Sequence, residues 1–132
     1  VSALGGADLV YGNLGADTLS GGDAADTMYG GQGNDLILGG SVGDVLFGNL
    51  GNDTISGGGG VGVDSLFGGA GNDSLVDLNG SALLSGGAGD DVLTFGDQGT
   101  LYGGEGNDTL LGSASIGTSL NVLYGGQGAD LV

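Results

Sequence analysis

Aspartates recur along the chain at the end of glycine-rich stretches, as in the segment GGQGND at residues 30–35. The chain holds 15 Asp and one Glu, and it has no Lys, Arg or His to pair with them. Short carboxylates set among glycines supply hard oxygen ligands, which favour calcium over the metals that prefer nitrogen and sulfur. The candidate chemistry is therefore coordination of a divalent cation, with Ca²⁺ as the first choice.

The composition supports cation binding and argues against several other functions. The formal charge is −16, while 39% of the 132 residues are hydrophobic. A compact chain with this charge repels itself unless positive ions are added, yet it is too apolar for a solvated acidic tail. No residue can neutralise a phosphate, which argues against nucleic acid, and no apolar run approaches the ~20 residues of a membrane span. Without Cys, His or Lys, we expect no enzyme.

A nine-residue repeat organises these aspartates. When each recurring Asp is placed at position six of a unit, position eight is aliphatic or Met in all fourteen units. Positions seven to nine predict a short strand with the middle side chain inward, and the glycine-rich positions one to six predict a turn. Two units then make one coil of a stack. The position-eight residues are Val10, Leu19, Met28, Ile37, Leu46, Ile55, Leu66, Leu75, Leu84, Leu93, Leu101, Leu110, Leu123 and Val132.

Alternate units belong to opposite edges of such a stack, so the aspartates form two rows. The even-numbered units carry Asp at position six without exception. This even row consists of Asp17, Asp35, Asp53, Asp73, Asp91, Asp108 and Asp130. The odd row begins with Asp8, Asp26, Asp44 and Asp64 and continues with Ala82, Gly99 and Asn121. Length changes occur only in odd units, as they would if the even edge had a chemical function.

Position nine separates the two rows again, because most of the aromatic residues end odd units. One interpretation is cross-strand stacking that stabilises one sheet. The alternative is an interface, first of all with a second copy of the chain, since a continuous exposed apolar stripe commonly meets a partner. The aromatic residues in this column are Tyr11, Tyr29, Phe47, Phe67, Tyr102 and Tyr124, and Ser85 interrupts them.

The repeat resembles the RTX (hemolysin-type calcium-binding) family, whose motif is GGxGxDxUx with U aliphatic. The cleanest units are GGQGNDLIL at 30–38, GGAGNDSLV at 68–76 and GGEGNDTLL at 103–111. The resemblance covers essentially all 132 residues. It implies an all-β fold, a right-handed parallel β-roll (β-solenoid) of about seven two-strand coils, as a single domain over 1–132. This domain is either a segment of a longer protein or a protomer that stacks end to end.

The same resemblance implies where calcium binds. In the family, neighbouring turns on one edge hold an ion between two aspartates and several backbone carbonyls. All seven aspartates of the even row and the four of the odd row are therefore expected ligands. About six ions are expected on the even edge and up to three more on the odd edge, where Val42 and the insertion before Asp64 weaken the case. The remaining acidic residues, which we expect on the solvated surface, are Asp23, Asp77, Asp90, Asp97 and Glu105.

These features predict a calcium-binding structural module of a secreted or cell-surface bacterial protein, such as an adhesin, an S-layer-like protein or an extracellular filament component. The expected location is extracellular, because sites of this class need more calcium than the cytosol holds. The alternative is an accessory domain that assists secretion of an enzyme, namely a protease, lipase or alginate epimerase, whose catalytic part lies outside this chain. Calcium ions are the expected partners in both cases.

Overall fold

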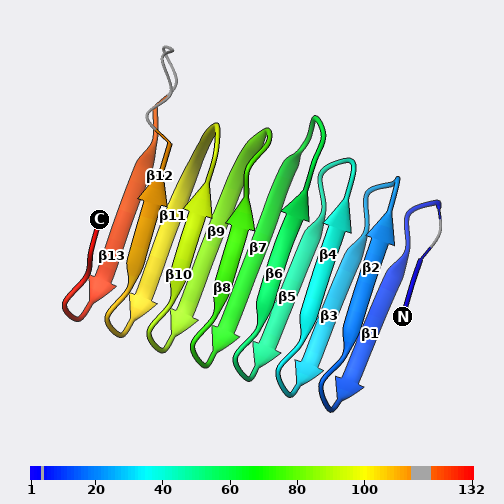
Figure 1. The fold of residues 1–132 in the computed structure, drawn as a ribbon, viewed down its shortest axis with the longest axis horizontal. Helices are drawn as coiled ribbons and strands as arrows, with labels where there is room; N and C mark the ends of the chain where they lie inside the picture. Colours follow the sequence, from blue (N-terminus) through cyan, green and yellow to red (C-terminus); the bar gives the residue numbers. More distant parts are fainter. Residues whose placement is uncertain (4, 114–119) are drawn as a thin grey trace.

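The computed structural model describes residues 1–3, 5–113 and 120–132, and they form thirteen β-strands in two parallel sheets that face each other (Figure 1). No helix that could cross a membrane occurs in these ranges. The seven-stranded sheet consists of β1 (Leu9–Leu14), β3 (Thr27–Gln32), β5 (Val45–Leu50), β7 (Val63–Ala70), β9 (Ser81–Ala88), β11 (Gln98–Glu105) and β13 (Val122–Gln127). The six-stranded sheet consists of β2 (Thr18–Gly22), β4 (Leu36–Gly40), β6 (Thr54–Gly58), β8 (Ser74–Asp77), β10 (Val92–Phe95) and β12 (Thr109–Gly112).

The chain winds as a parallel β-roll, as the repeat predicts. Consecutive strands alternate between the two sheets, and each strand pairs with the strand one coil away. The turns that carry the even row of aspartates lie along the lower edge in Figure 1, and those that carry the odd row lie along the upper edge. All aspartates of one row are thereby brought to one edge of the roll.

The strands are longer than the three residues that the repeat predicts. A typical strand such as β3 continues through the first two or three residues of the next unit. Thirteen of the fourteen predicted strands form, and the last is reduced to an isolated bridge between Leu131 and Thr109. The glycine-rich start of each unit is therefore partly extended, and the sharp turn is confined to about three residues before each Asp.

The core is the column of position-eight side chains between the sheets. Twelve of the fourteen, from Val10 to Leu110, are buried, as predicted. Leu123 is partly buried, and Val132 at the end of the roll is 65% exposed. Full burial of such a side chain contributes about 1.5–3 kcal/mol, so this column is the main apolar source of stability. Ala82 and Phe95 join the core although the repeat did not predict them there.

The aromatic residues of position nine stack as a ladder on the seven-stranded sheet. Tyr11, Tyr29, Phe47 and Phe67 form three consecutive stacked pairs, with ring centroids 4.7–5.1 Å apart. Tyr102 and Tyr124 form a separate pair at 5.0 Å. These distances equal the strand spacing, so the in-register pairing produces the stack. The cross-strand interpretation is confirmed, and an intermolecular interface stays a prediction.

Candidate metal sites

Along the even edge, the aspartates of successive coils are joined by a ladder of hydrogen bonds. The backbone N–H of each Asp donates to Oδ1 of the Asp in the following coil. Asp17 donates to Asp35 and Asp35 to Asp53, each at 2.8 Å. The ladder continues to Asp130 with donor–acceptor distances of 2.8–3.0 Å. The turns thus place one carboxylate per coil in the same orientation along the whole edge.

The second carboxylate oxygen of these aspartates is buried without a hydrogen-bond partner among the described residues. Such an orphaned acceptor costs about 1–3 kcal/mol, and a charged one costs more, unless a partner is supplied. Each rung of the edge therefore presents one satisfied oxygen and one that needs a positive partner. On the even edge these Oδ2 atoms belong to Asp17, Asp35, Asp53, Asp73, Asp91 and Asp108.

The glycine at position one of each turn makes room for this oxygen. A Cβ at Gly68 would meet Oδ2 of Asp73 and would lie 2.6 Å from the carbonyl oxygen of Gly86, one coil away. The same arrangement recurs at Gly48, next to Asp53 and Gly68. A carboxylate oxygen and a backbone carbonyl oxygen of the next coil therefore lie side by side at these rungs, and oxygens of both kinds are ligands that calcium prefers.

Burial makes the charged form of these carboxylates unfavourable. It raises the pKa of Asp73 to about 7 and that of Asp91 to about 6, against the opposing effect of the amide hydrogen bond, and neighbouring carboxylates raise both further. Burial likewise raises the pKa of Asp53 and Asp108. No side-chain cation exists in the sequence to relieve this column. A divalent cation would relieve it.

The first four aspartates of the odd edge have the same geometry as the even row. Asp8 donates to Asp26 and Asp26 to Asp44 at 2.8 Å, and Asp44 donates to Asp64 at 2.7 Å. Burial raises the pKa of Asp44 to about 6. The insertion before Asp64 does not break this ladder. Calcium binding at the odd edge stays a prediction.

A second ladder runs along the even edge at position five, and sequence reasoning missed it. Here the N–H of the later coil donates to the side chain of the earlier coil, opposite to the aspartate ladder. Asn52 donates to Asn34 at 2.9 Å, and Asn72 donates to Asn52 at 2.8 Å. Asp90 takes the place of an asparagine in this ladder and accepts from Asn107 at 2.7 Å. The recurring GND triplet was the available signal.

One prediction about the remaining acidic residues is wrong. Asp23, Asp90, Asp97 and Glu105 are exposed, as expected. Asp77, however, is 2% exposed, and its Oδ2 is buried without a hydrogen-bond partner among the described residues. It stands at position one of its unit, where the side chain points into the roll instead of into solvent.

The donor set fits calcium better than a metal that needs several side-chain ligands. Within the described ranges, no three acidic residues gather at one point. Each rung instead offers two carboxylates, one from each of two coils, together with backbone carbonyls. An all-oxygen set of this kind suits Ca²⁺, which takes six to eight oxygens in flexible geometry.

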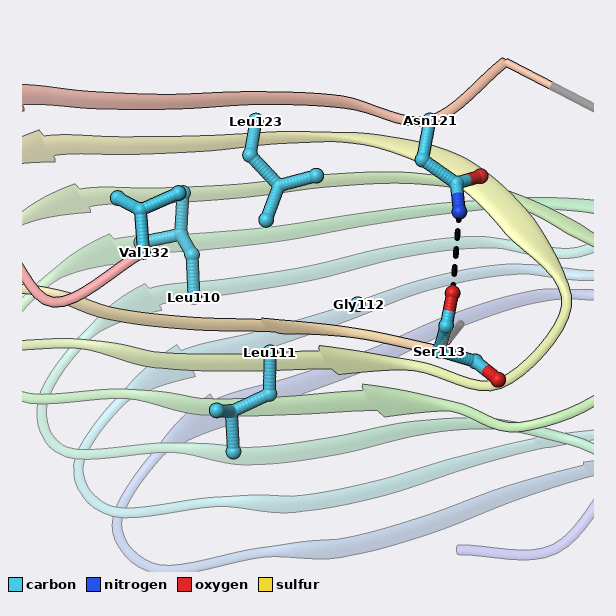
Figure 2. Close-up of a pocket in the computed structure, with 7 residues that line it drawn as sticks. All are labelled: Leu110, Leu111, Gly112, Ser113, Asn121, Leu123 and Val132. Atoms are coloured by element: carbon cyan, nitrogen blue, oxygen red, sulfur yellow. Dashed lines mark hydrogen bonds between the residues drawn. The ribbon is translucent and has the colours of Figure 1, made fainter. Parts of the chain in front are cut away.

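A cavity at the C-terminal end of the core has a different character. It has a volume of about 370 Å³ and is lined by residues of β12 and β13 and their neighbours, none of them acidic (Figure 2). Asn121 donates from Nδ2 to the carbonyl oxygen of Ser113 across its rim at 3.2 Å. Its lining of Leu110, Leu111, Leu123 and Val132 supplies no metal ligand.

Comparison with protein families shows which family of repeats the chain matches. The model of the RTX calcium-binding nonapeptide repeat (4 copies) matches residues 2–37, 38–75, 67–99, 100–115 and 117–132. The chain belongs to this family. RTX repeats are calcium-binding modules, generally of secreted proteins, and they are structural rather than catalytic. No curated protein and no solved structure matches the chain.

Proposed function

We propose that this chain is a calcium-dependent structural module of a secreted or cell-surface protein, such as an adhesin, an S-layer-like protein or an extracellular filament component. The observation that carries the proposal is that eight aspartates of the two rows each have one buried carboxylate oxygen that lacks a hydrogen-bond partner among the described residues. A bound calcium ion supplies positive charge to these oxygens and links adjacent coils. The regular stacking of the coils places successive aspartates at the same spacing, so the same calcium link can form between each pair of coils.

The proposed ligands are the aspartates that the two edges bring together. Six rungs lie between the seven aspartates of the even row, and three lie between Asp8, Asp26, Asp44 and Asp64. Nine ions, one per rung, would carry a charge of +18 against the formal −16 of the chain. Ion binding therefore removes the self-repulsion that opposes the compact state.

We further propose that folding is coupled to calcium binding. A site assembled from two coils does not exist in the unfolded chain, so the free energy of binding contributes directly to folding. Extracellular modules bind calcium with dissociation constants of about 10⁻⁴–10⁻³ M, which favours an extracellular location. Such a chain would stay unfolded at the low calcium concentration inside the cell and would fold at the higher concentration outside it.

Far-ultraviolet circular dichroism during titration with Ca²⁺, followed by EDTA, tests this function. We expect a reversible transition from coil to β-structure that Mg²⁺ does not reproduce, because Mg²⁺ demands stricter octahedral geometry. The double variant Asp53→Asn with Asp73→Asn should need severalfold more calcium, because both side chains are buried in the even row. Exposed Asp97→Asn is the matched control and should titrate like the parent chain. A chain that keeps its β-structure in EDTA at neutral pH would contradict the proposal.

A further inference from the structure

The odd-edge unit at residues 77–85 exchanges the residue types of positions one and six. Regular units have Gly at position one and Asp at position six, as in Gly39 and Asp44. Here Asp77 stands at position one and Ala82 at position six. The unit thus keeps one carboxylate and one small residue, but the carboxylate is at the start of the turn and the small residue is at its end.

The geometry of the regular turns explains why this exchange preserves the position of the carboxylate. In the preceding coil, a Cβ at Gly57 would lie 2.5 Å from Oδ2 of Asp64, so positions one and six share one volume. In the coil of Asp77, residue 82 pairs in register with Asp64, and its methyl group leaves that volume free. Asp77 ends β8 with its side chain buried, and it fills the volume from the opposite side.

The environment of Asp77 matches that of the candidate ligands. Oδ1 accepts the N–H of Asn79 at 3.1 Å, and Oδ2 is buried without a hydrogen-bond partner among the described residues. Burial raises the pKa of Asp77 to about 6; the Asn79 hydrogen bond opposes this effect, and the adjacent Asp64 carboxylate adds to it. The carboxylates of Asp77 and Asp64, which belong to neighbouring coils, are thus both buried and adjacent, and the sequence holds no side-chain cation.

The next coil shows that the carboxylate column stops at this point. Phe95 occupies position one, in register with Asp77, and its ring is buried. Gly99 stands at position six, and a Cβ there would lie 3.4 Å from Cγ of Phe95. The shared volume of this coil is filled by an apolar ring, which offers no ligand for a cation.

We propose that Asp64 and Asp77 hold one further divalent cation, a fourth rung on the odd edge in which position one replaces position six as the source of the ligand. This inference rests on the proposed calcium-binding function and adds a ligand that the repeat pattern does not identify. Because Ca²⁺ needs further oxygens, the backbone carbonyls of the two turns complete the set. Phe95 then closes the column on its C-terminal side.

Counting the bound ions tests the assignment. Equilibrium dialysis with radioactive calcium should give one ion fewer per chain for Asp77→Asn than for the parent chain, with the ions of the even edge retained. The double variant Asp77→Gly with Ala82→Asp rebuilds a regular unit and should recover the lost ion. Asp97→Asn, which removes an exposed carboxylate, is the matched control and should leave the count unchanged.

The outcomes separate this inference from the proposed function. An Asp77→Asn chain that binds as many ions as its parent overturns the inference, and it would indicate that the two carboxylates share a proton instead. A parent chain that binds no calcium overturns the proposed function itself. If Asp77→Asn fails to fold, anomalous scattering from crystals of the parent chain grown in calcium decides, because the inference requires a peak between Asp64 and Asp77.

Discussion

At the scale of single residues, two demands on glycine coexist in each turn. Position two needs a positive φ, which Gly31 adopts at 117° and which Asn13 and Asn49 adopt at 79°. Asparagine tolerates this region better than other side chains, so it substitutes there. Position one has no such need, and its glycine is required because the aspartate oxygen and a carbonyl of the next coil occupy the space of a Cβ.

Substitution at position one should therefore be costly even though the backbone allows it. We expect Gly68→Ala to lower the free energy of unfolding by about 1–3 kcal/mol, as overpacking does. The new methyl group would displace Asp73 or the carbonyl of Gly86. Gly59→Ala is the matched control, because its Cβ would meet only Asn79 Nδ2 at 3.6 Å, and it should change stability by no more than about 0.5 kcal/mol. Denaturant unfolding in saturating calcium measures both, and equal losses would contradict this explanation.

The sequence was sufficient to predict the residues that repeat, and it was insufficient where a unit departs from the pattern. The buried position-eight column and the two rows of aspartates follow from spacing alone. Asp77 was predicted on the surface because it is off position six, and its burial follows from a compensating exchange with Ala82 across the turn. Such an exchange becomes visible only when two positions five residues apart are known to share one volume.

At the scale of elements, each edge is a stack of turns in which the repeating side-chain hydrogen bonds join one coil to the next. The aspartate ladder and the asparagine ladder of the even edge run in opposite directions. Neighbouring coils between Asn34 and Ala129 therefore exchange one hydrogen bond in each direction. Sequence reasoning predicted the turns but not these ladders, because the direction of a side-chain hydrogen bond depends on the backbone of a neighbouring coil. It also underestimated strand length, since glycine was interpreted as turn although part of the glycine-rich segment pairs.

The buried carboxylate column predicts an unusual dependence of stability on pH. The pKa of Asp73 is raised to about 7 and the pKa of Asp44 and Asp91 to about 6, from an ordinary value of 3.8. Between the ordinary pKa of 3.8 and the raised values of about 6 to about 7, the folded chain binds more protons than the unfolded chain. The free energy of unfolding without metal therefore falls as pH rises through this interval. Calcium competes with the same protons, so calcium affinity should rise over that interval.

Circular dichroism in EDTA between about pH 5 and about pH 8 checks the sign of this dependence. The metal-free chain should gain β-structure toward the acidic end, and the gain should reverse as pH rises. In Asp73→Asn, which removes the group with the highest of these pKa values, the transition should be shallower. Metal-free β-structure that increases with pH would be the opposite result and would reject the electrostatic account of the edge.

At the scale of the whole molecule, the roll presents an acidic edge on two sides and an aromatic ladder on one sheet. Tyr11, Tyr102 and Tyr124 are about half exposed, while the rings between Tyr11 and Phe67 are more covered by their neighbours. Internal stacking accounts for the ladder without a partner. Lateral association of two copies through it is a separate proposal, motivated by the exposed tyrosines.

Sedimentation velocity over a range of concentrations tests association of the folded chain. We expect concentration-dependent dimers in calcium and none in EDTA, where the roll does not form and the charge of −16 keeps chains apart. Replacing Tyr11, Tyr102 and Tyr124 by Ser, the residue that position 85 already has in this column, should abolish the dimers while the roll still forms. A strict monomer in calcium at high concentration would leave stacking as the sole role of the ladder.

Because Ser85 interrupts the aromatic ladder, the two stacked tyrosine pairs lie in separate parts of the roll and can be observed separately by spectroscopy. Tyrosines stacked 5.1 Å apart at positions 11 and 29, and 5.0 Å apart at positions 102 and 124, are close enough for their electronic transitions to couple. Each coupled pair exists only while its own coils are in register. Near-ultraviolet spectra of chains that retain one pair or the other would therefore reveal which end of the roll frays first, without any attached dye.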